Sequence, residues 1–209
     1  MASPAGEGGD MGDGGTYDAS TALVVVDVQN DFADPDGSLY VQGGEQVVQR
    51  VNAEIAAARE AGALVVYTQD WHPGSTPHFE KDGGVWPVHC VQGSWGAEFH
   101  PDLDVLTGAP VVRKGTGGED GYSGFTVRDP ESGEEEATRL EDILRESGTE
   151  RVVVVGLALD YCVKETALDA ARKGYDTVLL TEATSAVDRQ PGDGDQAIDD
   201  VRAAGATVR

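Results

Sequence analysis

Thr21-Ala-Leu-Val-Val-Val-Asp27 is a short, β-branched run that ends abruptly in a carboxylate. A strand that is apolar throughout is buried on both faces, which is typical of a parallel sheet covered by helices on both sides. The segments 151–155 and 176–181 repeat this apolar pattern further along the chain. The stretch therefore predicts a buried strand of an α/β protein, with a polar group placed at its carboxyl end.

Short apolar runs alternate with segments of helical periodicity along the rest of the chain. In the segment 46–61 the apolar residues recur at helical spacing, and Gly62 ends it. Thr138 and Glu141 form a capping-box pair at the start of another helical segment. The predicted strands are 21–26, 63–68, 110–112, 151–155, 176–181 and 206–208, and the predicted helices are 46–61, 138–147, 163–173 and 196–204. This alternation predicts a three-layer α/β/α fold around a central, mostly parallel six-stranded sheet.

The length of 209 residues suits one domain with a well-buried core. We place this domain at residues 21–209. Residues 1–20 are rich in Gly and Asp and contain neither a basic residue nor an apolar core, so they do not form a signal peptide. We expect a disordered tail there. No run approaches the roughly 20 apolar residues of a membrane span.

The composition is strongly acidic, with a formal net charge of −23 and a sequence pI of about 4.2. Such a surface repels nucleic acids and anionic membranes, and we expect neither as a partner. The acidity indicates either general solubility or adaptation to high salt. Two cysteines, Cys90 and Cys162, do not make a disulfide framework. Without an export signal, we expect a cytoplasmic protein with reduced thiols. The sequence leaves a homo-oligomer open.

Four polar residues follow or end predicted strands, and ligands of open parallel sheets bind beyond this edge. They are Asp27, Asp70, Lys114 and Cys162. One such residue would mean little, but four at one edge of one sheet predict a single site. Strand order, which decides their proximity, is not visible in the sequence.

Cys162 is the candidate nucleophile, because it lies where a strand gives way to a predicted helix. A helix N-terminus favours a thiolate, and its free backbone N–H groups could stabilise an oxyanion. A thiol at its ordinary pKa also needs a base, and Asp27 is the nearest by topology. Lys114 could hold the two in register by its charge. Individually, Cys162 could instead be a buried core residue, Asp27 a turn cap and Lys114 a surface residue.

Asp70-Trp-His72 places two ligand-type side chains on one side of the chain after a strand. His89 is a third candidate ligand, and Asp plus two His leave coordination positions open, as catalytic metal sites require. His78 is a further ligand or an outer contact. Any one of these histidines taken alone could equally be a core residue.

Two long irregular stretches, 71–109 and 115–137, stand out, and loops of this length are usually functional or disordered. The first carries all four histidines and all three tryptophans. Within it we expect Cys90 and His100 to be structural. The acidic end of the second stretch, 131–136, is predicted to be a solvated turn.

Five segments, in this order, resemble the isochorismatase-like cysteine hydrolases, and within them the nicotinamidase-like members. They are Val26-Asp-Val-Gln-Asn-Asp-Phe32, Asp70-Trp-His-Pro73, Trp86-Pro-Val-His-Cys90, Arg113-Lys-Gly115 and Gly156-Leu-Ala-Leu-Asp-Tyr-Cys-Val163. The resemblance covers residues 22 to about 190. It implies an Asp27–Lys114–Cys162 triad. It also implies an oxyanion hole made by the backbone N–H groups of Ala158 and Cys162, with a cis peptide before Ala158.

The resemblance further implies one divalent metal, with zinc ahead of iron and manganese. Asp70, His72 and His89, with His78 as a further candidate, would hold this metal. Phe32 and Trp86 match positions that sandwich a pyridine ring.

Tyr122 or Phe125 would close the pocket over the substrate. The segment 119–136 is longer and more acidic than expected for the family, and it could reshape the mouth of the site. The implied reaction is hydrolysis of nicotinamide to nicotinate and ammonia in NAD salvage, through a cysteine thioester. Alternatives are an amidohydrolase of the same fold that acts on another small amide or ureide, and a non-catalytic binding domain.

Overall fold

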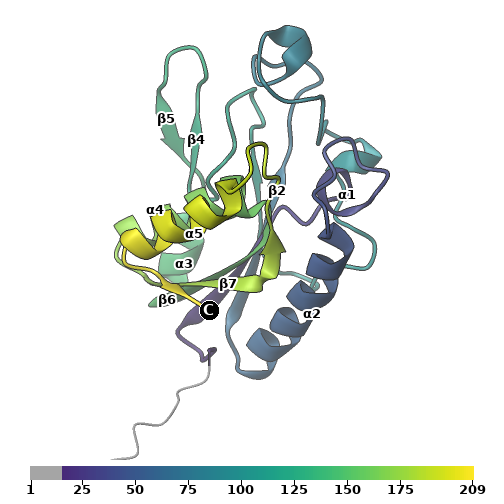
Figure 1. The fold of residues 1–209 in the computed structure, drawn as a ribbon. Helices are drawn as coiled ribbons and strands as arrows, with labels where there is room; N and C mark the ends of the chain where they lie inside the picture. The colour runs from purple at the N-terminus through teal and green to yellow at the C-terminus, as the bar shows by residue number, and fades with distance from the viewer. Residues whose placement is uncertain (1–15) are drawn as a thin grey trace, which may run out of the picture.

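A central parallel sheet of six strands organises the molecule (Figure 1). The computed structural model describes residues 16–209, so most of the tail predicted over 1–20 lies outside the described residues. The strand order is β3-β2-β1-β6-β7-β8, and every neighbouring pair is parallel. The strands are β1 (Thr21–Val26), β2 (Leu64–Asp70), β3 (Val111–Lys114), β6 (Arg151–Leu157), β7 (Asp176–Ser185) and β8 (Thr207–Val208).

Helices cover both faces of this sheet, which confirms the predicted three-layer fold (Figure 1). The helices are α1 (Asn30–Ala33), α2 (Gly44–Glu60), α3 (Leu140–Glu146), α4 (Lys164–Arg172) and α5 (Asp193–Ala203). Leu23 and Val25 of β1 share a buried cluster with the apolar face of α2. Val24 and Val26 point to the opposite face and share a second cluster with residues of α3, α4 and α5. The uninterrupted apolar run therefore reflects burial on both faces. None of the helices among residues 16–209 is long and apolar enough to cross a membrane.

The structure corrects the local predictions at two places. The segment 115–137, expected to be irregular, contains an antiparallel hairpin of β4 (Thr126–Arg128) and β5 (Glu135–Ala137). The capping box also does not form. Helix α3 begins after Arg139, Thr138 Oγ1 accepts the N–H of Leu140, and Glu141 pairs with Lys173 instead.

Strand order brings the predicted polar strand ends together, because β3, β2, β1 and β6 are consecutive neighbours. Asp70 pairs in register with Lys114, and Val26 pairs with Gly156. At Gly156 the backbone has a φ of +112°, and a Cβ there would lie 2.1 Å from the carbonyl oxygen of Val26. Only glycine fits this close approach, which seats the following turn against the end of β1.

Candidate active site

Asp27 is fully buried at the carboxyl end of β1, with a φ of +47°. One carboxylate oxygen lies 2.7 Å from Lys114 Nζ. The other accepts a hydrogen bond of 2.6 Å from Thr68 Oγ1, which in turn accepts the backbone N–H of Asp27 at 3.2 Å. The buried ion pair and the threonine together fix the direction in which this carboxylate points.

Lys114 is also fully buried, at the end of β3. Its ammonium group contacts Asp27, donates to the carbonyl of Gly121 and lies 3.5 Å from that of Tyr122. Burial lowers the pKa of Lys114, but the charges of Asp27, Cys162 and Asp70 outweigh it and raise the pKa above its ordinary value. Lys114 therefore stays charged and acts as a fixed cation among acids.

Cys162 lies in a single π-helical turn, Leu159–Val163, ahead of α4, rather than at the start of a regular helix as predicted. The side chain is 7% exposed and faces the same pocket as Asp70 and His89. Burial raises the pKa of the Cys162 thiol well above its ordinary value, although the charge of Lys114 lowers it. The expected stabilisation of a thiolate by a helix terminus is thus outweighed by desolvation. Burial likewise raises the pKa of Asp27, against the charge of Lys114. The resting cysteine is a neutral thiol beside a carboxylate that can take its proton.

The peptide bond between Leu157 and Ala158 is cis, as the family resemblance implied. Ala158 and Cys162 both line the pocket, so the backbone at both expected oxyanion donors borders the space where a carbonyl would react.

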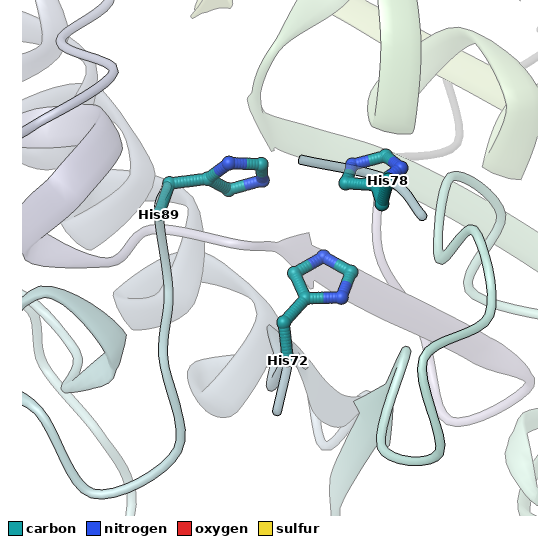
Figure 2. Close-up of side chains that lie close together, drawn as sticks. All are labelled: His72, His78 and His89. Carbon is teal, nitrogen blue, oxygen red and sulfur yellow. The ribbon is translucent and has the colours of Figure 1, made fainter. Parts of the chain in front are cut away.

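His72, His78 and His89 converge beside these residues (Figure 2). Each offers one ring nitrogen, these nitrogens all lie within 4.8 Å of one another, and all three residues are buried. Asp70 adjoins the cluster, because its Oδ2 lies 3.1 Å from His72 Nε2 and 3.6 Å from His89 Nε2. The structure thus groups His78 with the two predicted ligands, and Asp70 contacts two of the three rings.

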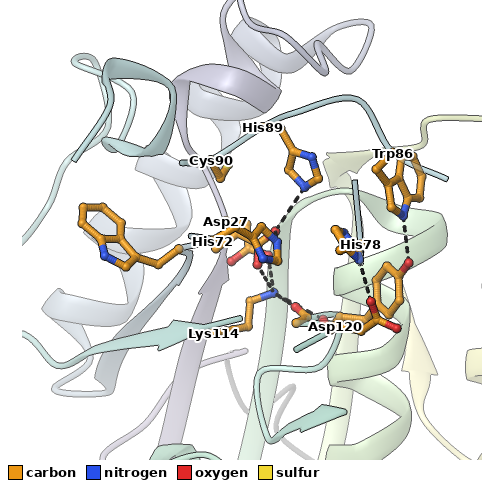
Figure 3. A network of polar contacts seen from close by, with 12 residues as sticks. Asp27, His72, His78, Trp86, His89, Cys90, Lys114 and Asp120 are labelled. Carbon is orange, nitrogen blue, oxygen red and sulfur yellow. Dashed lines mark hydrogen bonds and ion pairs between the residues drawn. The ribbon is translucent and has the colours of Figure 1, made fainter. Parts of the chain in front are cut away.

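Protein oxygens hold the outer nitrogens of two of these rings, and Figure 3 shows the first of them, between His78 and Asp120. His78 Nδ1 lies 2.6 Å from Asp120 Oδ1, and His89 Nδ1 lies 2.8 Å from the carbonyl of Pro87. In both rings this contact leaves Nε2 to face the shared space. Histidines bound to metals are oriented in this way by partners on their second nitrogen. The donor set of three imidazoles and one carboxylate fits a divalent transition metal such as zinc.

A largely apolar pocket of about 400 Å³, counted out to its open mouth, joins the thiol to the histidine cluster. Trp86 Nε1 donates to the hydroxyl of Tyr122 at 2.8 Å, which links two loops across the pocket. Phe125 instead lies buried against Tyr175, outside the pocket. The lining residues are Phe32, Leu39, Asp70, His78, Trp86, His89, Gly121, Tyr122, Ala158, Tyr161, Cys162 and Val187.

Several site residues were not found by sequence reasoning. Thr68 resembles any strand threonine, and Asp120 lies within a run of Gly and acidic residues. Tyr161 packs edge-on against Trp86 at 4.8 Å, and Arg189 lies 5.0 Å over the same ring. Asp160 accepts the N–H groups of Val187 and its neighbour, each at 2.9 Å, and so ties a distant loop to the turn of Cys162. Only Asp160 and Tyr161 carried a usable signal, because they directly precede the predicted nucleophile in the chain.

The predicted structural residues behave as expected. Cys90 is fully buried in the apolar core, and its backbone N–H donates to Asp31 Oδ2 at 2.7 Å. His100 Nδ1 accepts the N–H of Asp102 at 3.2 Å, away from the other three histidines.

The chain belongs to the isochorismatase family, because the isochorismatase domain model matches residues 21–209. A nicotinamidase of Escherichia coli is 38% identical to it over 203 residues, which cover 90% of this chain and 93% of the relative. A zinc complex of Pyrococcus horikoshii pyrazinamidase superposes with a TM-score of 0.81 at 39% identity, covering 91% of this chain and 98% of that one. A nicotinate complex of the L. infantum protein gives a TM-score of 0.83 at 37% identity, covering 93% and 94%. These three relatives are a nicotinamidase, a pyrazinamidase and a protein solved with nicotinate.

Proposed function

We propose that this chain is a nicotinamidase, which hydrolyses nicotinamide to nicotinate and ammonia and so serves NAD salvage. The single observation that carries the proposal is one pocket lined by Cys162 and by two of the three clustered histidines, His78 and His89. A carboxamide at the thiol and a ring nitrogen at the histidine cluster match the two ends of nicotinamide. The relatives named nicotinamidase and the nicotinate complex support the same substrate.

The buried triad suits nucleophilic attack on an amide. Asp27 takes the proton of Cys162, and the sulfur attacks the carboxamide carbon to give a tetrahedral oxyanion. The backbone N–H groups of Ala158 and Cys162 stabilise this oxyanion. Protonated Asp27 then gives its proton to the amide nitrogen as the C–N bond breaks, ammonia leaves, and a thioester remains.

Water completes the reaction. Asp27, again a carboxylate, takes a proton from water that attacks the thioester carbon, and the second tetrahedral species collapses to nicotinate. The proton returns to the sulfur, which restores the thiol. Lys114 stays charged throughout and keeps Asp27 oriented in both of its protonation states, since its pKa is raised by its acidic neighbours. Asp27 must both accept and donate, and the rise in its pKa through burial favours this double role.

His72, His78, His89 and Asp70 would hold one divalent metal, with zinc ahead of iron and manganese. When bound, the metal would supply a Lewis-acid contact for the pyridine nitrogen, directly or through water. The chain itself supplies the walls, because Phe32, Trp86 and Tyr122 line the pocket with aromatic surface. Flat aromatic walls favour a planar ring over a flexible ureide.

Ammonia release from nicotinamide tests the proposal. We expect turnover by the zinc-loaded chain, loss of turnover in Cys162→Ala, and reduced turnover after chelation. Cys90→Ser is the matched control, because it changes the other thiol, which lies outside the pocket. No turnover by the metal-loaded wild type would reject nicotinamide as the substrate, and small ureides would then be tried. Equal turnover in Cys162→Ala would reject the cysteine mechanism.

A further inference from the structure

Asp120 is a polar partner of the histidine cluster that the mechanism above does not use. Its Oδ1 lies 2.6 Å from His78 Nδ1, and its side chain is 21% exposed against 5% for His78. Of the three acids in the segment 119–129, only Asp120 contacts the histidine cluster; its neighbour Glu119 accepts the N–H of Gly117 instead. The contact is therefore specific to one carboxylate of an acidic segment.

This contact decides which nitrogen of His78 is free. An ionised carboxylate only accepts hydrogen bonds, so the proton of a neutral His78 lies on Nδ1. The lone pair then lies on Nε2, the ring nitrogen that Asp120 does not contact. The same carboxylate fixes the rotation of the ring and increases its basicity as a ligand.

Asp120 is itself held in place by β4, a strand of the hairpin within the segment that could shape the mouth of the site. Its backbone N–H donates to the carbonyl of Arg128 at 2.7 Å, and the N–H of Arg128 donates back at 3.0 Å. The loop that carries His78 is fastened to the same segment, because Thr76 Oγ1 donates to the carbonyl of Gly118 at 2.7 Å. The loop of His78 and Asp120 are thus both tied to the segment 115–137, the loop by the Thr76 side chain and Asp120 by its backbone.

We infer that Asp120 is a positioning residue, which sets the affinity of the metal centre by orienting His78 and holding its proton on Nδ1. The inference rests on the metal centre of the proposed function. The inference also gives the hairpin of β4 and β5 a role. The hairpin supports Asp120, and Asp120 orients the metal ligand His78 from outside the pocket.

The test measures zinc affinity and not activity. The full chain is stripped of metal with EDTA, dialysed, and titrated with Zn²⁺ against a chromophoric chelator. We expect Asp120→Asn and Asp120→Ala to weaken zinc binding by about 10- to 100-fold, the usual effect of losing such a partner. Glu119→Gln is the matched control, since it removes one negative charge from the adjacent residue, and we expect its affinity to remain within about twofold of the wild type.

A double-mutant cycle separates positioning from general damage. If Asp120 acts through His78, Asp120→Asn causes no further loss of affinity in a His78→Ala background, whereas independent effects add. An undiminished loss in that background, or wild-type affinity in Asp120→Asn, overturns the inference. Absence of zinc binding by the wild type overturns it as well. A wild type that binds zinc but releases no ammonia from nicotinamide rejects the proposed function and leaves this inference standing.

Discussion

Replacement of Thr68 by valine tests whether Asp27 is the base. Valine has nearly the shape of threonine but removes two buried contacts, the 2.6 Å donation to Asp27 Oδ1 and the 3.2 Å acceptance from the Asp27 N–H. A hydrogen bond to a charged group contributes about 1.5–3 kcal/mol, and an orphaned buried N–H costs about 1–3 kcal/mol. We expect Thr68→Val to lower the free energy of unfolding by about 2–4 kcal/mol.

The same change shifts the titration of Asp27. The bond from Thr68 lowers the pKa of this carboxyl, so its loss raises the pKa further above the ordinary value. Because the base must be deprotonated to take the thiol proton, the acid limb of kcat/KM should move to higher pH.

The assay is ammonia release from nicotinamide across a range of pH, with urea unfolding run in parallel. Thr21→Val is the matched control, because Thr21 Oγ1 makes the same pair of bonds to Asp18, at 2.8 Å to the carboxylate and 3.3 Å from the N–H, at the opposite end of the sheet. It should reduce stability with no shift of the acid limb. An unshifted limb in Thr68→Val would refute the assignment of Asp27 as the base.

Two substitutions test other parts of the site, and a change of salt concentration tests the charge of the whole chain. In Gly115→Ala the new Cβ would lie 2.5 Å from the ring of His72 at a φ of +68°, so zinc content and activity should both fall at least about tenfold; full zinc occupancy would contradict this. Removing the guanidinium over Trp86 in Arg189→Gln should raise KM about two- to fivefold and leave kcat unchanged; a fall in kcat alone would argue against a role in ring binding. Screening by KCl should raise the unfolding temperature of a chain with net charge −23, and a flat response would exclude adaptation to salt.

The fold followed from local patterns because the strands are buried on both faces and the helices carry an apolar stripe. The four polar strand ends were also readable, since polar groups at the carboxyl ends of parallel strands meet wherever the strands are neighbours. The sequence did not reveal that β3, β2, β1 and β6 are consecutive. Strand order depends on long-range packing, and no local signal encodes it.

The rest of the site was hidden for different reasons. Threonine is common in strands because of its β propensity, so nothing in the sequence indicated that Thr68 would donate a hydrogen bond to Asp27. The hairpin of β4 and β5 was missed because each strand has only three residues, too few to show apolar alternation, and β5 is exposed and acidic. Arg189 and Asp120 reach the site from loops fixed by contacts between distant segments.

The neutral state of Cys162 bears on what happens between turnovers. Peroxides and alkylating agents attack thiolates far faster than thiols, so a buried cysteine with a raised pKa reacts slowly with both. In the proposed mechanism the sulfur becomes a strong nucleophile only while Asp27 holds its proton. Under the proposed mechanism, a neutral thiol of this kind is oxidised slowly between turnovers. No second cysteine is then needed to reduce it again.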